Sequence, residues 1–71
     1  MSPDKLVYMA NQIATFFHSQ PEGERVTRVA GHIKDFWEPR MRKQLFEIID
    51  GGAAGLDPLV LSAVEKLRKA A

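Results

Sequence analysis

The chain has 71 residues, which is enough for one small domain, and it contains no cysteine. Disulfide bonds, thiolate metal sites and cysteine nucleophiles are therefore excluded, so a partner protein is the remaining source of added stability. Ten basic and nine acidic residues give a net charge of +1, which is too small to predict nucleic-acid binding from bulk charge.

The first helix is predicted over residues 3–19. Ser2 is a favourable N-cap, and Pro3 suits the first helical position because an N–H group there would have no helical partner. Apolar residues then recur three and four positions apart, which predicts one buried face. The residues of this face are Leu6, Met9, Ala10, Ile13, Phe16 and Phe17.

The outer face of this first helix lacks charge. No Asp, Glu, Lys or Arg occurs from Leu6 to Gln20, and the side opposite the apolar face presents Tyr8, Asn11, Gln12 and small hydroxyl residues. Depletion of charge beside a tyrosine is typical of a buried protein contact. Tyr8, Asn11 and Gln12 are therefore predicted partner contacts, and an ordinary polar surface is the alternative.

A second helix is predicted over residues 22–37, with an apolar face that repeats the spacings of the first. Its members are Val26, Val29, Ala30, Ile33, Phe36 and Trp37. The matching faces predict an antiparallel helical hairpin in which Ala10 and Ala30 allow the two helices to approach closely. An internal repeat is one explanation of the match, and the general likeness of amphipathic helices is the other.

Two further helices are predicted over residues 39–50 and 58–69. Pro39 disfavours helical geometry at Glu38, so the chain bends before the third helix begins. Asp57 is the expected N-cap of the fourth helix, because its side chain can accept a hydrogen bond from a free N–H of the first turn.

No stretch of the chain alternates with the period of two that a half-buried strand requires. The predicted fold class is therefore all-α, with three to four short helices forming one domain over residues 1–71. No apolar run approaches the roughly 20 residues needed to span a bilayer, and the N-terminus lacks the layout of a signal peptide. A cytoplasmic protein is therefore expected.

The boundary between the second and third helices supplies a second set of candidate contacts. Two aromatic residues, a proline bend and three cations fall within residues 36–43. Trp37 either packs in the buried face of the second helix or contacts a partner protein. Arg40 and Arg42 lie outside the apolar face of the third predicted helix, so they are predicted to reach outward to carboxylates or carbonyls of another protein. A solvated basic face is the alternative. Phe46 also points away from that face and is a candidate exposed anchor.

Residues that could carry catalysis are not grouped in the sequence. His18 and His32 fall on different predicted helices without metal-ligand spacing, and no nucleophile elbow, phosphate loop or paired-carboxylate motif is present. The chain by itself is therefore not expected to be an enzyme, or to bind a metal or a cofactor.

Two segments of the sequence resemble a known family. They read Met-Ala-Asn-Gln-Ile at residues 9–13 and His-Ile-x-x-Phe-Trp-x-Pro-Arg-Met-Arg at residues 32–42. Both resemble the delta subunit of bacterial NAD-dependent formate dehydrogenase. The resemblance extends to Leu-Asp-Pro at residues 56–58 and Ala-Val-Glu-Lys-Leu at residues 63–67, so it covers nearly the whole chain.

The resemblance implies a place in a cytoplasmic complex that oxidises formate to carbon dioxide and reduces NAD. In such enzymes the alpha subunit carries a molybdenum or tungsten pterin and iron–sulfur clusters, the beta subunit carries FMN and the NAD site, and the gamma subunit carries a further cluster. The delta subunit carries none of these groups. Its implied role is to bind and stabilise the alpha subunit, or to help assemble it.

Two other functions stay open at this stage. One is a transient maturation factor that leaves the enzyme after cofactor insertion. The other is a small helical nucleic-acid-binding or self-associating regulator that uses Arg40, Arg42 and Lys43, although the near-neutral charge and the nearby Asp35 and Glu38 count against it. The uncharged first helix fits a homodimer of the isolated chain as readily as a contact with another subunit.

Overall fold

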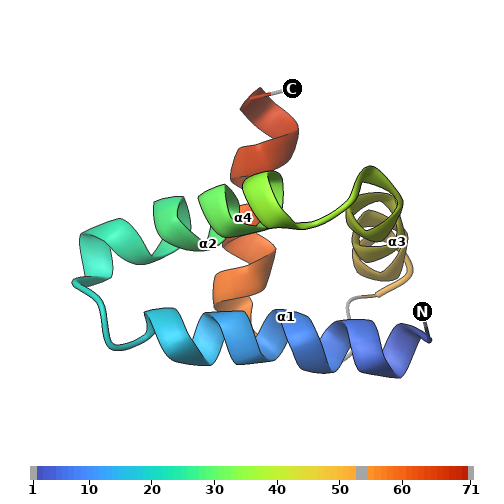
Figure 1. Cartoon of the computed structure of the whole chain (residues 1–71), viewed down its shortest axis with the longest axis horizontal. Coiled ribbons are helices and arrows are strands. Elements are labelled where there is room, and N and C mark those ends of the chain that lie inside the picture. The colour runs from blue at the N-terminus through green and yellow to red at the C-terminus, as the bar shows by residue number, and fades with distance from the viewer. Residues whose placement is uncertain (1, 53–54, 71) are drawn as a thin grey trace.

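The computed structural model describes residues 2–52 and 55–70, and it places them in four helices without any strand. These are α1 (Pro3–Phe17), α2 (Glu22–Phe36), α3 (Pro39–Asp50) and α4 (Pro58–Ala70) (Figure 1). The all-α prediction is confirmed. None of these helices is both long enough and apolar enough to cross a membrane, as far as the described residues are concerned.

Figure 1 shows α1 and α2 running antiparallel, with α4 crossing both of them steeply and α3 lying beside the ends where α1 begins and α2 finishes. The most extensive helix–helix contact joins α2 to α4, and α1 contacts each of the other three helices. The hairpin predicted from the sequence is therefore present, but α4 rather than α1 is the main packing partner of α2.

The core lies where the four helices meet. Its largest fully buried side chains come from all four of them. They are Leu6, Val29, Ile33, Leu45, Val60 and Val64. Ala10, Ala30 and Ala63 are buried among them, and small residues at these positions let the helix backbones approach closely. The predicted placement of Ala10 and Ala30 in the core is therefore confirmed.

The helix ends follow from local chemistry. The Ser2 hydroxyl accepts a hydrogen bond from the Lys5 N–H at 3.3 Å, so the predicted N-cap is confirmed. α1 ends at Phe17, two residues before the predicted end, because the Gln20 N–H bonds to the Phe17 carbonyl at 3.0 Å in a tighter turn. α2 ends one residue early, since Trp37 adopts an extended backbone with ψ of 135°.

Candidate protein-binding surfaces

Two phenylalanines that the helical spacing assigns to the core are on the surface. Phe16 is 66% exposed and Phe36 is 75% exposed, so that assignment is wrong for both. Phe16 follows buried Ala14 by two residues, which turns it about 160° around the helix. Phe36 is the last residue of α2, and the buried position at that end is taken by Trp37.

These phenylalanines belong to a row of rings that joins α1 to α2. The rings of Phe16 and Phe17 meet edge to face with centroids 5.0 Å apart, and Phe17 lies 6.2 Å from His32. His32 in turn lies 4.9 Å from Phe36. The groove at this row is lined mainly by apolar atoms of Gln12, Ile13, Phe16, Phe17 and His32. We call these residues, with Phe36, the aromatic groove.

The aromatic groove continues along α1 through two of the predicted contact residues. Tyr8, Gln12 and Phe16 recur every four residues, so they stand in one row on the helix. Tyr8 is 64% exposed, and its hydroxyl accepts a hydrogen bond from the Gln12 amide at 3.1 Å. Three large exposed rings beside the uncharged stretch of α1 make this surface more apolar than one that faces only water.

Asn11, the third contact predicted on this helix, faces elsewhere. It precedes Phe16 by five residues and therefore lies about 140° from it around the helix. Its amide nitrogen donates to the Gly55 carbonyl at 2.8 Å, and its amide oxygen accepts from the Asp57 N–H at 2.8 Å. Asn11 thus has an internal role, which is to hold the start of α4 against α1.

His18 completes this connection. Its Nε2 lies 3.0 Å from Asp57 Oδ2, while Asp57 Oδ1 accepts from the Leu59 N–H at 2.8 Å and so caps α4, as predicted. Burial acts to raise the pKa of the Asp57 carboxyl, but the bonds from Leu59 and His18 outweigh it and hold that pKa below its ordinary value. We call Asn11, His18, Gly55 and Asp57 the α1–α4 latch.

The chain turns through the latch at Gly55. This residue has a φ of +81°, in the region that favours glycine, and its carbonyl is the acceptor for the Asn11 amide. A side chain at position 55 would therefore strain the backbone of the latch.

Trp37 packs in the core. It is 5% exposed, and its N–H donates to the Ile33 carbonyl at 3.1 Å to close the last turn of α2. Of the two roles left open by the sequence, the buried one fits this geometry, and little of the ring is left for a partner to touch.

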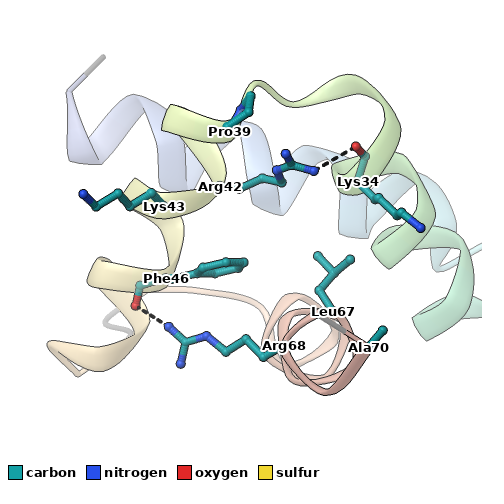
Figure 2. A pocket seen from close by; sticks show the side chains of 8 residues that line it. All are labelled: Lys34, Pro39, Arg42, Lys43, Phe46, Leu67, Arg68 and Ala70. Atoms are coloured by element: carbon teal, nitrogen blue, oxygen red, sulfur yellow. Dashed lines mark hydrogen bonds between the residues drawn. The ribbon is translucent and has the colours of Figure 1, made fainter.

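A second surface feature, which we call the basic pocket, opens between the C-terminal end of α2, α3 and the end of α4 (Figure 2). Figure 2 shows the Phe46 ring and the Leu67 side chain facing each other across it, with Arg42 and Arg68 on either side. The complete lining consists of Lys34, Pro39, Arg42, Lys43, Phe46, Leu67, Arg68 and Ala70. It therefore combines four cations with an apolar floor and includes no acidic side chain.

The two arginines that were predicted to reach outward differ in the structure. Arg42 is half-buried, and its Nη1 donates to the Lys34 carbonyl at 3.1 Å, which ties α3 to the last turn of α2. The carbonyl it binds is therefore in its own chain. Arg40 is exposed and lies outside the pocket lining, so it stays a predicted contact.

Phe46 is half-buried rather than fully exposed, because Arg68 covers it. The Arg68 guanidinium lies 4.7 Å from the centre of the Phe46 ring. It donates to both carboxylate oxygens of Asp50, at 2.8 and 3.0 Å, and to the Phe46 carbonyl at 3.2 Å. The hydrogen bond between Asp50 and Arg68 lowers the pKa of the acid and raises that of the base. Arg68 thus forms a fixed wall of the basic pocket.

Two of these features were not predicted from the sequence. The ion pair of Arg68 with Asp50 joins residues on different helices, and no local spacing marks it. The exposure of Phe16 and Phe36 was missed because both fit the helical period of the core. The absence of charged residues from Leu6 to Gln20 nevertheless indicated an exposed apolar surface, since the same stretch carries Phe16 and Phe17. No group of three His, Cys, Asp or Glu side chains that could hold a metal occurs in the described part of the chain.

Comparison with known proteins gives one finding. The family model described as NADH-dependent formate dehydrogenase delta subunit FdsD matches residues 5–64. No curated protein and no solved structure matches the chain. The matched range contains the whole aromatic groove, the α1–α4 latch and the α2 and α3 parts of the basic pocket.

Proposed function

Because the chain belongs to the FdsD family of formate dehydrogenase delta subunits, we propose that it is a resident, non-catalytic accessory subunit of the dehydrogenase complex. It binds and stabilises the alpha subunit, which carries the pterin cofactor, and the beta and gamma subunits complete the complex. The enzyme oxidises formate and reduces NAD through groups held by those partners. This chain contributes neither a metal nor a cofactor, and it works in the cytoplasm.

The observation that carries this proposal is the aromatic groove. Phe16 and Phe36 expose large apolar rings next to an α1 surface without charge. Exposed rings of this kind lower the solubility of a free small protein, and they are enriched at the centres of protein interfaces. A partner that covers the groove would bury both rings and the neighbouring Tyr8.

The proposed contact residues fall into two groups. Tyr8, Gln12, Phe16 and Phe36 form the centre of the interface, where burial of apolar area supplies affinity. Arg42 and Phe46 line the basic pocket, and exposed Arg40 precedes them on α3; these three residues, predicted from the sequence, form a second contact area. Asn11 and Trp37 act indirectly, by holding α1 and the end of α2 in place.

The test is purification of the tagged chain from its native host under non-denaturing conditions. We expect formate-dependent NAD reduction and the visible absorbance of flavin and iron–sulfur clusters to elute with the tag. Quantitative mass spectrometry should give a fixed ratio of about one copy of the tagged chain per alpha chain. Elution of the chain without dehydrogenase subunits would contradict the proposal.

The same purification separates a resident subunit from a transient maturation factor. A resident subunit stays with enzyme that already contains its cofactors and is active. A maturation factor is found only with alpha chains that lack the pterin, so its ratio to alpha falls towards zero in the active fraction. We expect the first result, because a surface as apolar as the aromatic groove is best kept permanently covered.

A further inference from the structure

Among the described residues, three of the four cations that line the basic pocket have no ion-pair partner. Lys34 and Lys43 have no carboxylate partner within the described residues, and the Arg42 guanidinium bonds only to a neutral carbonyl. Of the four cations that line the pocket, Arg68 is the one that pairs with an acid in the part of the chain that the structure describes. Three uncompensated positive charges therefore surround one opening.

The apolar part of the pocket lining is best covered by an apolar group of a ligand. Phe46 and Leu67 face each other across it, and Pro39 and Ala70 complete the apolar wall (Figure 2). An inorganic anion would satisfy the cations and leave these side chains in contact with water. A ligand that fits both parts has to combine a carboxylate with a neighbouring apolar side chain, which is a common arrangement in an acidic protein segment.

The walls of the pocket are positioned before any ligand binds. Arg42 is held by the Lys34 carbonyl at 3.1 Å, and Arg68 is held by three hydrogen bonds to α3. The two lysines lie on either side of the opening, and their flexible stems allow the ammonium groups to reach a bound carboxylate. Groups already in place lose little conformational freedom on binding, which favours affinity.

We propose that the basic pocket receives an acidic segment of a partner subunit. A carboxylate of the segment pairs with Lys34, Arg42 and Lys43, and an adjacent apolar side chain enters between Phe46 and Leu67. This inference rests on the proposed function, because the partner is a subunit of the same dehydrogenase complex. It adds a second, charge-dependent contact to the one made by the aromatic groove.

A protein segment fits this pocket better than a nucleic acid does. A nucleic-acid backbone needs a continuous positive track, whereas exposed Asp35, Glu38 and Glu47 lie on the same helices or at their ends and confine the positive charge to the pocket. The net charge of +1 is too small to attract a nucleic acid to the rest of the surface.

The first experiment reverses the charge of the pocket. The Lys34→Glu/Lys43→Glu variant is compared with Lys5→Glu/Lys66→Glu, which changes the same number of exposed lysines that form no ion pair with another described residue. Each tagged chain is co-expressed with the other subunits, and the affinity for the complex is measured. We expect the pocket variant to bind at least about tenfold more weakly and the control to bind within about twofold of the unchanged chain. Circular dichroism and thermal melting establish that both variants fold. If the charge-reversed variant does not fold, Lys34→Ala/Lys43→Ala is the milder replacement, and it should also bind more weakly.

The second experiment identifies the bound segment. A benzophenone side chain placed at Ala70, an exposed position on the pocket wall, is photo-crosslinked within the complex and the product is sequenced by mass spectrometry. We expect a peptide from a partner subunit that contains Asp or Glu next to an apolar residue. Replacing that acid by Lys should then restore binding of the Lys34→Glu/Lys43→Glu variant.

The outcomes separate the two proposals. If the unchanged chain and the control bind the complex while the pocket variant binds equally well, the pocket inference is wrong and the accessory function stands. A crosslink to nucleic acid, or to a peptide without a carboxylate, also overturns the inference. If the unchanged chain does not bind the complex at all, the proposed function fails and the inference falls with it.

Discussion

The two edges of α1 have similar polar sequences and opposite roles. Along one edge Tyr8, Gln12 and Phe16 are exposed, and the Gln12 amide donates to the Tyr8 hydroxyl on the same edge. Along the other edge Asn11 and His18 bind the start of α4. The uncharged polar residues of one edge are explained by internal hydrogen bonds, and we propose that those of the other edge contact a partner. Only the three-dimensional arrangement distinguishes the two edges.

The largest expected effect concerns the exposed edge and its continuation on α2. Replacing both rings, Phe16→Ser/Phe36→Ser, should weaken binding to the dehydrogenase complex by about a hundredfold or more, because central aromatic residues at interfaces each contribute about 2 kcal/mol or more. Thermal melting of the isolated chain should change little, since both rings are exposed. The matched control is Phe16→Leu/Phe36→Leu, which keeps most of the apolar area and should keep most of the affinity.

The next largest effect is expected from two residues that are adjacent in the sequence but lie on different edges of α1. Asn11→Ala removes two hydrogen bonds of the latch and leaves the Asp57 N–H without its partner, so we expect a loss of roughly 2 kcal/mol in unfolding free energy. The melting temperature should fall by about 10 °C. Gln12→Ala removes a single exposed hydrogen bond and should cost less than about 0.5 kcal/mol. Equal destabilisation by the two variants would contradict the separation of the edges.

The sequence anticipated much of this fold and only part of the site. Helical spacing identified four helices, and the caps at Ser2 and Asp57 followed from side-chain chemistry within four residues. The internal role of Asn11 could not be predicted, because its hydrogen-bond partners at Gly55 and Asp57 lie far along the chain. The exposure of Phe16 was missed because the buried side of α1 is formed by Leu6, Ala10 and Ala14, and the apolar pattern read from the sequence did not include Ala14.

A smaller effect distinguishes the aromatic groove from the basic pocket. Contacts between exposed charges are screened by salt, whereas burial of apolar area is not weakened by it. Affinity of the unchanged chain for the complex should therefore fall roughly three- to tenfold between about 50 and 500 mM NaCl. In Lys34→Gln/Lys43→Gln most of that dependence should disappear, and in Phe16→Leu/Phe36→Leu it should remain. Surface plasmon resonance over a salt series provides the measurement.

The smallest effect belongs to the latch and depends on pH. The folded-state pKa of Asp57 lies below its unfolded value of 3.8, so the ionised carboxylate stabilises the fold above about pH 4 and that contribution is lost as pH falls further. Asp57→Asn keeps an N-cap acceptor for Leu59 and removes the charge facing His18. It should lower stability at pH 7 by less than about 1 kcal/mol and reduce the loss on acidification, as followed by chemical denaturation at several pH values.

The most direct test of the central claim is oxidative footprinting of side chains, in which hydroxyl radicals modify exposed rings and mass spectrometry locates the products. The isolated chain and the purified dehydrogenase complex would be treated in parallel. We predict that oxidation of Phe16 and Phe36 is several-fold slower in the complex, while buried Trp37 reacts slowly in both. Equal oxidation of Phe16 and Phe36 in the free and bound chains would contradict the proposal that the aromatic groove binds the partner subunit.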